Sequence, residues 1–164
     1  MQEGDRVREL ATQTVADHVA RLFVEANTLL GDDVVSTFRR CLASETSPTG
    51  RDILTQLLEN TELARESGVP LCQDTGLAVV FLEIGQDLHL EGGDLYEAVH
   101  GGVRKGCAEG YLRASVVSPP VGKRVNTGDN TPAIIHTTIV PGDRLRILVA
   151  PKGGGSENTS AIRM

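Results

Sequence analysis

The sequence predicts an α+β fold, in which N-terminal helices precede a small mixed or antiparallel sheet with packed helices. Residues 1–70 carry apolar side chains at the spacing of three and four that marks helices. Residues 77–84 form a short continuous apolar run typical of a buried strand, and two more such runs follow at 133–140 and 144–150. We therefore expect an N-terminal helical segment and then an α/β segment over 71–164, within one domain overall.

The first two helices follow from apolar periodicity. Residues 7–30 carry apolar side chains at positions i, i+3, i+4 and i+7, which gives a helix one buried stripe, and a glycine then ends the pattern. Asp32 or Asp33 is expected to cap the second helix. Because Cys41 falls on the apolar face of this second helix, we interpret it as a small core residue.

The end of the helical segment and the start of the sheet are marked by turn residues. Ser47-Pro48 combines a cap with a proline at the first helical position, so a third helix is expected to begin there. Gly68 and Pro70 end it. The turn at 71–76 comes next and leads directly into the apolar run at 77–84.

A fourth helix is expected to begin at Asp94, after a short strand at 88–90. Three glycines spaced by four lie along it, at Gly102, Gly106 and Gly110. Each costs a helix about 1 kcal/mol relative to alanine, so the pattern indicates close approach of another backbone. Cys107 lies beside this glycine stripe and is interpreted as a half-buried packing thiol.

The last third of the chain alternates between loops and apolar runs. Residues 114–132 are rich in proline and glycine and form a long loop, a type of segment that is usually functional. The runs on either side of Pro141-Gly142-Asp143 are predicted to pair as a β-hairpin near a sheet edge. Ser156 is expected to cap a last helix running through 161–162. Because the apolar stripe of this helix has scarcely begun, we expect the chain to be a piece of a larger protein or assembly.

Composition argues against several classes of protein. The net charge of −6, the aromatic content of 3% and a longest basic cluster of only Lys123-Arg124 argue against a nucleic-acid binder. No apolar run approaches the roughly 20 residues that span a bilayer, and the N-terminus lacks the apolar core of a signal peptide. Three widely spaced cysteines do not make a disulfide framework and fit a reducing cytoplasm.

Two turns concentrate groups that can carry chemistry. Gly153-Gly154-Gly155-Ser156 follows Lys152, and backbone N–H groups of glycines at an expected helix start suit a phosphate or a carboxylate. The spacing is neither a P-loop nor GxGxxG. A plain flexible loop between strand and helix is the alternative.

The other turn, 71–76, holds a thiol, an amide, a carboxylate and a hydroxyl. Taken alone, Cys72 is a nucleophile, a metal ligand or a buried thiol, and the absence of a CxxC pair argues against a zinc finger. A nucleophile would need a base, for which the sequence offers His89, His100 and His136; the last alternates within a strand and is interpreted as structural. Arg113 ends a helix, where it either pairs with carbonyl groups or clamps a carboxylate.

Four motifs in order resemble the iron–sulfur-dependent hydro-lyases, class I fumarase and the alpha subunit of L(+)-tartrate dehydratase. The resemblance covers roughly residues 5–164. The motifs are Cys72-Gln73-Asp74-Thr75-Gly76, Leu112-Arg113, Val125-Asn126-Thr127-Gly128-Asp129-Asn130-Thr131-Pro132-Ala133 and Lys152-Gly153-Gly154-Gly155-Ser156-Glu157-Asn158. Any one of them is weak evidence of kinship, but all four in this order and with the expected gaps are strong.

The resemblance implies roles for five residues in the hydration of a dicarboxylate. It implies that Cys72 is one of three cysteine ligands to a 4Fe–4S cluster whose open iron is a Lewis acid. It implies that Gln73 and Asp74 contact the substrate, with Asp74 orienting the hydroxyl or its proton. It also implies that Arg113 binds a substrate carboxylate and that Gly155 approaches the substrate.

The resemblance also implies that essential groups lie outside these residues. The family's other two cluster cysteines lie downstream of the Lys152-Gly153-Gly154-Gly155-Ser156 motif, and neither Cys41 nor Cys107 matches them. Its catalytic threonine and lysine and further arginines belong to a C-terminal domain or a beta subunit. We therefore expect a homo- or hetero-oligomer and little activity from this chain alone. Fumarate hydratase is the leading hypothesis, with L(+)-tartrate dehydratase second. A non-catalytic assembly module and a Cys72 thiol enzyme without iron are the alternatives from other classes.

Overall fold

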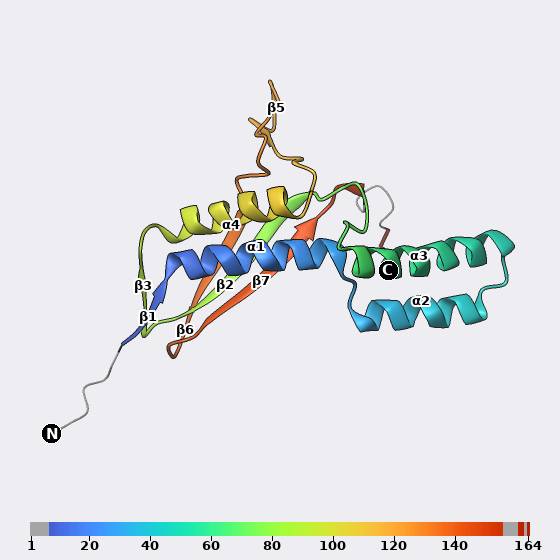
Figure 1. Ribbon diagram of the computed structural model, residues 1–164, viewed down its shortest axis with the longest axis horizontal. Coiled ribbons are helices and arrows are strands. Elements are labelled where there is room, and N and C mark those ends of the chain that lie inside the picture. The colour runs from blue at the N-terminus through green and yellow to red at the C-terminus, as the bar shows by residue number, and fades with distance from the viewer. Residues whose placement is uncertain (1–6, 156–160, 163) are drawn as a thin grey trace.

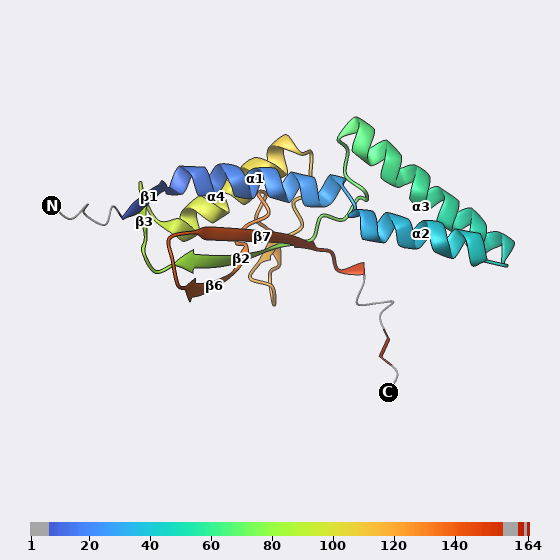
Figure 2. The same ribbon diagram turned by 90° about the horizontal axis from the view of Figure 1, so that it is seen from below.

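The computed structural model describes residues 7–155, 161–162 and 164. A three-stranded sheet lies at its centre, two helices cover one face of that sheet, and a pair of helices extends beyond its end (Figures 1 and 2). This arrangement confirms the predicted α+β class. In chain order the elements are β1 (Arg8–Ala11), α1 (Thr12–Thr28), α2 (Asp32–Ser44), α3 (Pro48–Ser67), β2 (Leu77–Gly85), β3 (Leu88–Glu91), α4 (Leu95–Glu109), β4 (Val117–Ser118), β5 (Val125–Asn126), β6 (Ile134–Val140) and β7 (Leu145–Lys152).

The first expected helix begins later than its apolar pattern predicts. Arg8–Ala11 is a strand that pairs in parallel with β3, with Leu10 opposite Leu90, and α1 begins only at Thr12. Both leucines pack against the core from this short ladder. The prediction was wrong here because the hydrogen-bonding partner lies 80 residues further along the chain, where local periodicity gives no sign of it.

The predicted cap of α2 was wrong, because Gly31 is its N-cap and neither Asp32 nor Asp33 caps it with a side chain. The ends of α3 are as predicted, and the apolar faces of both helices lie outside the main core cluster. The Ser47 side chain caps α3 by accepting a hydrogen bond from the Gly50 N–H at 3.3 Å, and Gly68 ends it in the left-handed conformation. Cys41, expected in the core, is exposed. The two helices pack mainly on each other, so within the described part of the chain nothing covers their outer faces.

The glycine stripe of α4 lies against α1, as predicted. A Cβ atom on Gly102 would lie 2.5 Å from the carbonyl oxygen of Ala16, and one on Gly106 would lie 2.8 Å from that of Ala20. Glycine therefore lets the two helix backbones approach closely. Cys107, beside the stripe, is buried and donates to the Leu112 carbonyl at 3.3 Å, which confirms it as a packing thiol.

The strand order is β6-β2-β7, so the predicted hairpin of neighbouring strands was wrong. β2 lies between the other two, parallel to β6 and antiparallel to β7. The turn from β6 to β7 wraps around the end of β2, where the Gly85 N–H donates to the Arg144 carbonyl at 2.8 Å and the Gln86 N–H donates to the Val140 carbonyl at 2.9 Å. The most apolar strand takes the centre because its alternate side chains fill the core beneath α1 and α4.

Only one face of β2 is covered, although its continuous apolar run predicted a buried strand. Ala78, Val80 and Leu82 are buried, whereas Phe81 points to the open face and stacks on the ring of His136 at 4.9 Å between centroids. His136 is itself exposed, and its structural role stays a prediction. None of the helices in the described residues has the length and apolar content needed to span a bilayer.

Candidate functional site

The strand register brings two of the sequence motifs together. β2 and β7 are antiparallel, and their last pair joins Leu77 to Lys152. The turn at 71–76 precedes β2 and the glycines at 153–155 follow β7, so both emerge at the same end of the sheet. Gly76, at φ +69°, lies where the two segments meet. A Cβ atom there would run into the Lys152 carbonyl, so this close approach requires glycine.

Asp74 joins the two motifs directly. Its carboxylate oxygen Oδ2 accepts a hydrogen bond from the Gly154 N–H at 3.1 Å. A Cβ atom on Gly153 would lie 3.1 Å from the same oxygen, so a side chain there would crowd the carboxylate. The Cys72 thiol is exposed beside it and donates to the Asp74 carbonyl at 3.4 Å. One N–H of the glycine-rich loop thus binds the carboxylate of Asp74 within the chain, whereas the binding of an external phosphate or carboxylate by this loop stays a prediction.

An open hollow of about 520 Å³ lies between the two motifs. It is lined by Cys72, Gln73, Asp74, Lys152 and Gly155, among others, so four of the five predicted site residues meet there. Neither Arg113 nor any of the three candidate histidines lines it. The nucleophile–base pair that a thiol enzyme needs is therefore not formed by these groups.

Arg113 is held next to the hollow by its backbone. Its N–H donates to the hydroxyl oxygen of Thr75 at 2.9 Å, while its side chain is exposed. Thr75 is 3% exposed, so this hydrogen bond forms inside the protein. The arginine is thereby anchored to the turn that carries Cys72 and Asp74.

Asn130 is a second residue that anchors the turn at 71–76, and the sequence motifs assigned it no role of its own. It is 0% exposed, and its amide nitrogen donates to the Gly76 carbonyl at 3.0 Å. Its amide oxygen accepts from the N–H of Ser115 at 2.9 Å and from that of Val116 at 3.3 Å. The sequence signal was its place in the third motif, which gave it no role of its own, and asparagine tolerates the left-handed conformation that it adopts at φ +62°.

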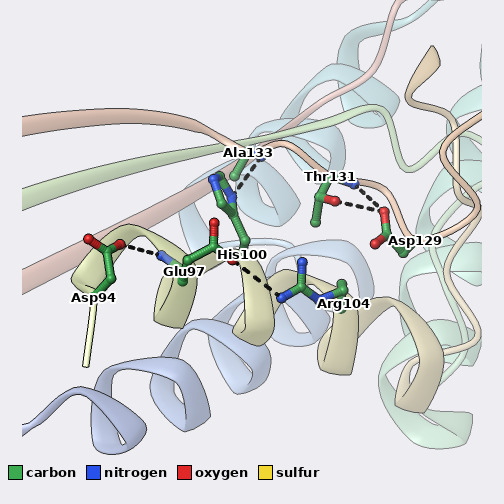
Figure 3. Close-up of polar contacts among 7 residues, drawn as sticks. All are labelled: Asp94, Glu97, His100, Arg104, Asp129, Thr131 and Ala133. Carbon is green, nitrogen blue, oxygen red and sulfur yellow. Dashed lines mark hydrogen bonds and ion pairs between the residues drawn. The ribbon is translucent and has the colours of Figure 1, made fainter. Parts of the chain in front are cut away.

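Figure 3 shows the polar contacts where the loop at 114–132 ends beside α4. The Asp94 side chain caps the helix at the Glu97 N–H, and one turn later the His100 Nδ1 accepts a hydrogen bond from the Ala133 N–H at 3.2 Å. Asp129 accepts from the Thr131 hydroxyl at 2.7 Å and from its N–H at 3.0 Å. These hydrogen bonds, with a smaller contribution from Arg104, hold the pKa of Asp129 below its usual value.

The three thiols lie in different environments. Cys72 is in the hollow, Cys41 is exposed on α2, and Cys107 is in the core, where burial raises its pKa. No group of three or more His, Cys, Asp or Glu side chains among the described residues is placed to hold a metal ion. Of the three thiols, only that of Cys72 lies in the hollow.

Comparison with known proteins assigns the family. The family model described as fumarate hydratase (Fumerase) matches residues 16–164, and the chain belongs to this family of hydro-lyases. It is 38% identical over 154 residues to the putative L(+)-tartrate dehydratase subunit alpha of Methanocaldococcus jannaschii, a match that covers 92% of this chain and 54% of the relative. It is 34% identical over 165 residues to the aerobic class I fumarate hydratase of Escherichia coli K12, covering 98% of this chain and 29% of the relative.

A third relative is the L(+)-tartrate dehydratase subunit alpha of Escherichia coli UTI89, which is 29% identical over 152 residues and is covered over 49% of its length. The chain thus spans about half the length of these tartrate dehydratase subunits and under a third of the fumarate hydratase.

Proposed function

We propose that this chain is the N-terminal, substrate- and cluster-binding part of a hydro-lyase that reversibly adds water to fumarate to give L-malate. Membership of the fumarate hydratase family supports the reaction class. The observation that carries the proposal is the hydrogen bond between Asp74 and Gly154, which brings the two most distinctive motifs into one hollow. A thiol, a carboxylate and a glycine-rich loop are the groups that cluster binding and dicarboxylate recognition need there.

Cys72 is proposed as one ligand of a 4Fe–4S cluster. Its thiol is exposed in the hollow, whereas Cys107 is buried elsewhere and Cys41 lies on α2. When bound, such a cluster supplies a Lewis acid toward the substrate hydroxyl. The other two ligands would come from sequence downstream of the glycine-rich loop at 153–155. The C-terminal domain or beta subunit, which would supply the catalytic threonine and lysine, is the partner that this proposal requires.

The other site residues recognise and orient the dicarboxylate. The planar guanidinium of Arg113 suits two parallel hydrogen bonds to one substrate carboxylate, and the backbone at Gly155 approaches the substrate. The Gln73 amide contacts the substrate from the same turn as Cys72. Because Oδ2 of Asp74 is held by Gly154, the orientation of the carboxylate is fixed and its Oδ1 can accept a proton from the substrate hydroxyl or orient it.

A second candidate is the alpha subunit of an L(+)-tartrate dehydratase. The match to the Methanocaldococcus jannaschii protein favours it, because the identity is 38% and the chain covers 54% of that relative, more than it covers of the fumarate hydratase. Both reactions move water across a dicarboxylate, so the same residues would serve either.

The test is anaerobic reconstitution of the complete enzyme, meaning this chain together with the later sequence or subunit, with iron and sulfide. Fumarate and L(+)-tartrate are assayed side by side. We expect iron uptake and turnover of one of the two, with fumarate preferred. Cys72→Ser should abolish both iron uptake and turnover. Cys41→Ser, a matched change at the other exposed thiol, should abolish neither of them.

A complete protein that never takes up iron would overturn the proposal, as would a Cys72→Ser variant with full hydratase activity. Turnover of L(+)-tartrate alone would replace the proposed substrate by the second candidate.

A further inference from the structure

We infer that Asn130 is a positioning residue that sets where Arg113 lies relative to the turn of Cys72 and Asp74. The inference follows from where its three hydrogen bonds go. One reaches the Gly76 carbonyl, directly after that turn, and two reach the N–H groups of Ser115 and Val116, just after Arg113. A single side chain thus connects the two segments that carry the proposed substrate-binding groups.

The amide group is suited to this connection. Gly76 presents a carbonyl, which needs a donor, whereas Ser115 and Val116 present N–H groups, which need an acceptor. An amide offers both at fixed geometry, while an ionised carboxylate offers acceptors only. Because Asn130 is 0% exposed, water cannot replace a lost partner without opening the loop, and an unsatisfied carbonyl would remain beneath the turn.

The Thr75 hydroxyl forms a second, parallel connection. It accepts from the Arg113 N–H at 2.9 Å, one residue before the carbonyl that Asn130 binds. Two hydrogen bonds at adjacent positions restrict both the separation and the rotation of the segment around Arg113. Among the side chains that the structure describes, loss of the Asn130 connection leaves the Thr75 hydroxyl as the one hydrogen-bonded link between the two segments, so the guanidinium would still be present but displaced.

The inference rests on the proposed function for its effect on catalysis, whereas its structural part does not. Asn130→Asp is the informative substitution, because aspartate also tolerates the left-handed backbone and keeps the acceptor for Ser115 and Val116. While the introduced group is ionised, it removes the donor to Gly76 and places a negatively charged oxygen against that carbonyl. Thr127→Val is the matched control in the same loop, since the Thr127 hydroxyl donates to the Val116 carbonyl at 3.3 Å and not to Gly76.

The first measurement uses this chain itself and needs no activity. Amide hydrogen exchange at Arg113 should become at least about tenfold faster in Asn130→Asp, because local opening of the connection exposes that N–H. Alkylation of Cys72 by iodoacetamide should change in rate in the same variant. Both should keep their wild-type values in Thr127→Val. Unchanged exchange at Arg113 in Asn130→Asp overturns the inference.

The second measurement uses the complete enzyme. A displaced carboxylate clamp weakens the binding of substrate and transition state alike, so the KM for the substrate should rise about tenfold with kcat little changed. Burial raises the pKa of the introduced carboxyl group, and below that pKa its O–H can again donate to Gly76. The KM should therefore fall back toward the wild-type value as the pH is lowered.

The two measurements distinguish a failure of the inference about Asn130 from a failure of the proposed function. An Asn130→Asp enzyme with a lower kcat, less cluster and an unchanged KM would show a merely structural asparagine and overturn the inference. A complete wild-type enzyme with no hydratase activity would overturn the proposed function, and the exchange at Arg113 would still decide the structural part.

Discussion

The carboxylate of Asp74 accepts a hydrogen bond at 3.1 Å from the backbone N–H of Gly154, a residue 80 positions later in the chain. This contact depends on the antiparallel register of β2 and β7, which ends with Leu77 opposite Lys152. A turn and a glycine loop that are each ambiguous in sequence therefore form one arrangement. The loop orients the acid, and the acid in turn holds the loop.

Asp74→Asn should remove the negative charge of this residue while keeping its hydrogen bond to Gly154. The amide oxygen can still accept from the Gly154 N–H, so the hollow should keep its shape. A neutral amide cannot take a proton, and the kcat of the complete enzyme should fall by about 10²–10⁴-fold. Thermal unfolding should change little. Asp52→Asn is the control, because Asp52 on α3 only accepts from the Gln56 amide at 3.0 Å. Turnover within twofold of wild type would show that Asp74 has no catalytic role.

Gly76→Ala should destabilise the fold at the junction of the site. Both Gly76, at φ +69°, and Gly122, at φ +99°, have left-handed backbones, so alanine is strained at either position. Only at Gly76 would the new Cβ atom run into another backbone group, the Lys152 carbonyl; at Gly122 it would meet nothing within 4 Å. Gly76→Ala should lower the free energy of unfolding by about 1–3 kcal/mol more than Gly122→Ala. Urea denaturation measures this difference, and equal losses would mean that the two backbones are not in contact.

Local chemistry explains which parts of the fold the sequence predicted. The cap at Ser47, the stop at Gly68 and the cap at Asp94 are each set by a residue and its near neighbours, and all three are confirmed. The strand at Arg8–Ala11 and the place of β2 between β6 and β7 were missed. Both depend on partners far along the chain, and the apolar pattern does not reveal those partners.

The same distinction applies to the site. Cys72, Gln73, Asp74 and Gly155 line one hollow, which their motifs led us to expect. Their roles toward a substrate and a cluster remain predictions. Thr75 and Asn130 were not singled out, because their side chains act on the backbone of remote segments. A sequence motif shows which side chains are present but not which carbonyl or N–H group each will meet.

The Cys107 thiol should make the protein less stable in alkali. Burial raises its pKa in the folded state, and Asp129 raises it further. Above about pH 8.5 the thiol ionises in the unfolded chain but not in the folded one, so the free energy of unfolding falls as the pH rises toward the folded pKa. Below the unfolded pKa this contribution is fully present. Cys107→Ser should flatten the decline, as measured by urea denaturation between about pH 8 and 10.

Cys41→Ser is the matched control for that experiment, because it makes the same substitution at an exposed thiol. Iodoacetamide provides an independent check. It should alkylate Cys41 and Cys72 well before Cys107 in the folded protein. Early alkylation of Cys107, or the same alkaline decline in Cys107→Ser as in the wild type, would contradict the burial of this thiol.

Two adjacent glycines of α4 should respond in opposite directions to the same substitution. Gly101→Ala should raise the free energy of unfolding by up to about 1 kcal/mol, because alanine is the better helix former and the nearest atom to the new Cβ is the flexible end of Arg104, 3.9 Å away. Gly102→Ala gains the same helix propensity but places its Cβ atom 2.5 Å from the Ala16 carbonyl oxygen, so α1 and α4 must separate. We expect a net loss of about 1–3 kcal/mol. Thermal unfolding of the two variants measures both changes. If both were stabilised, close helix contact could not be the reason for the glycine stripe.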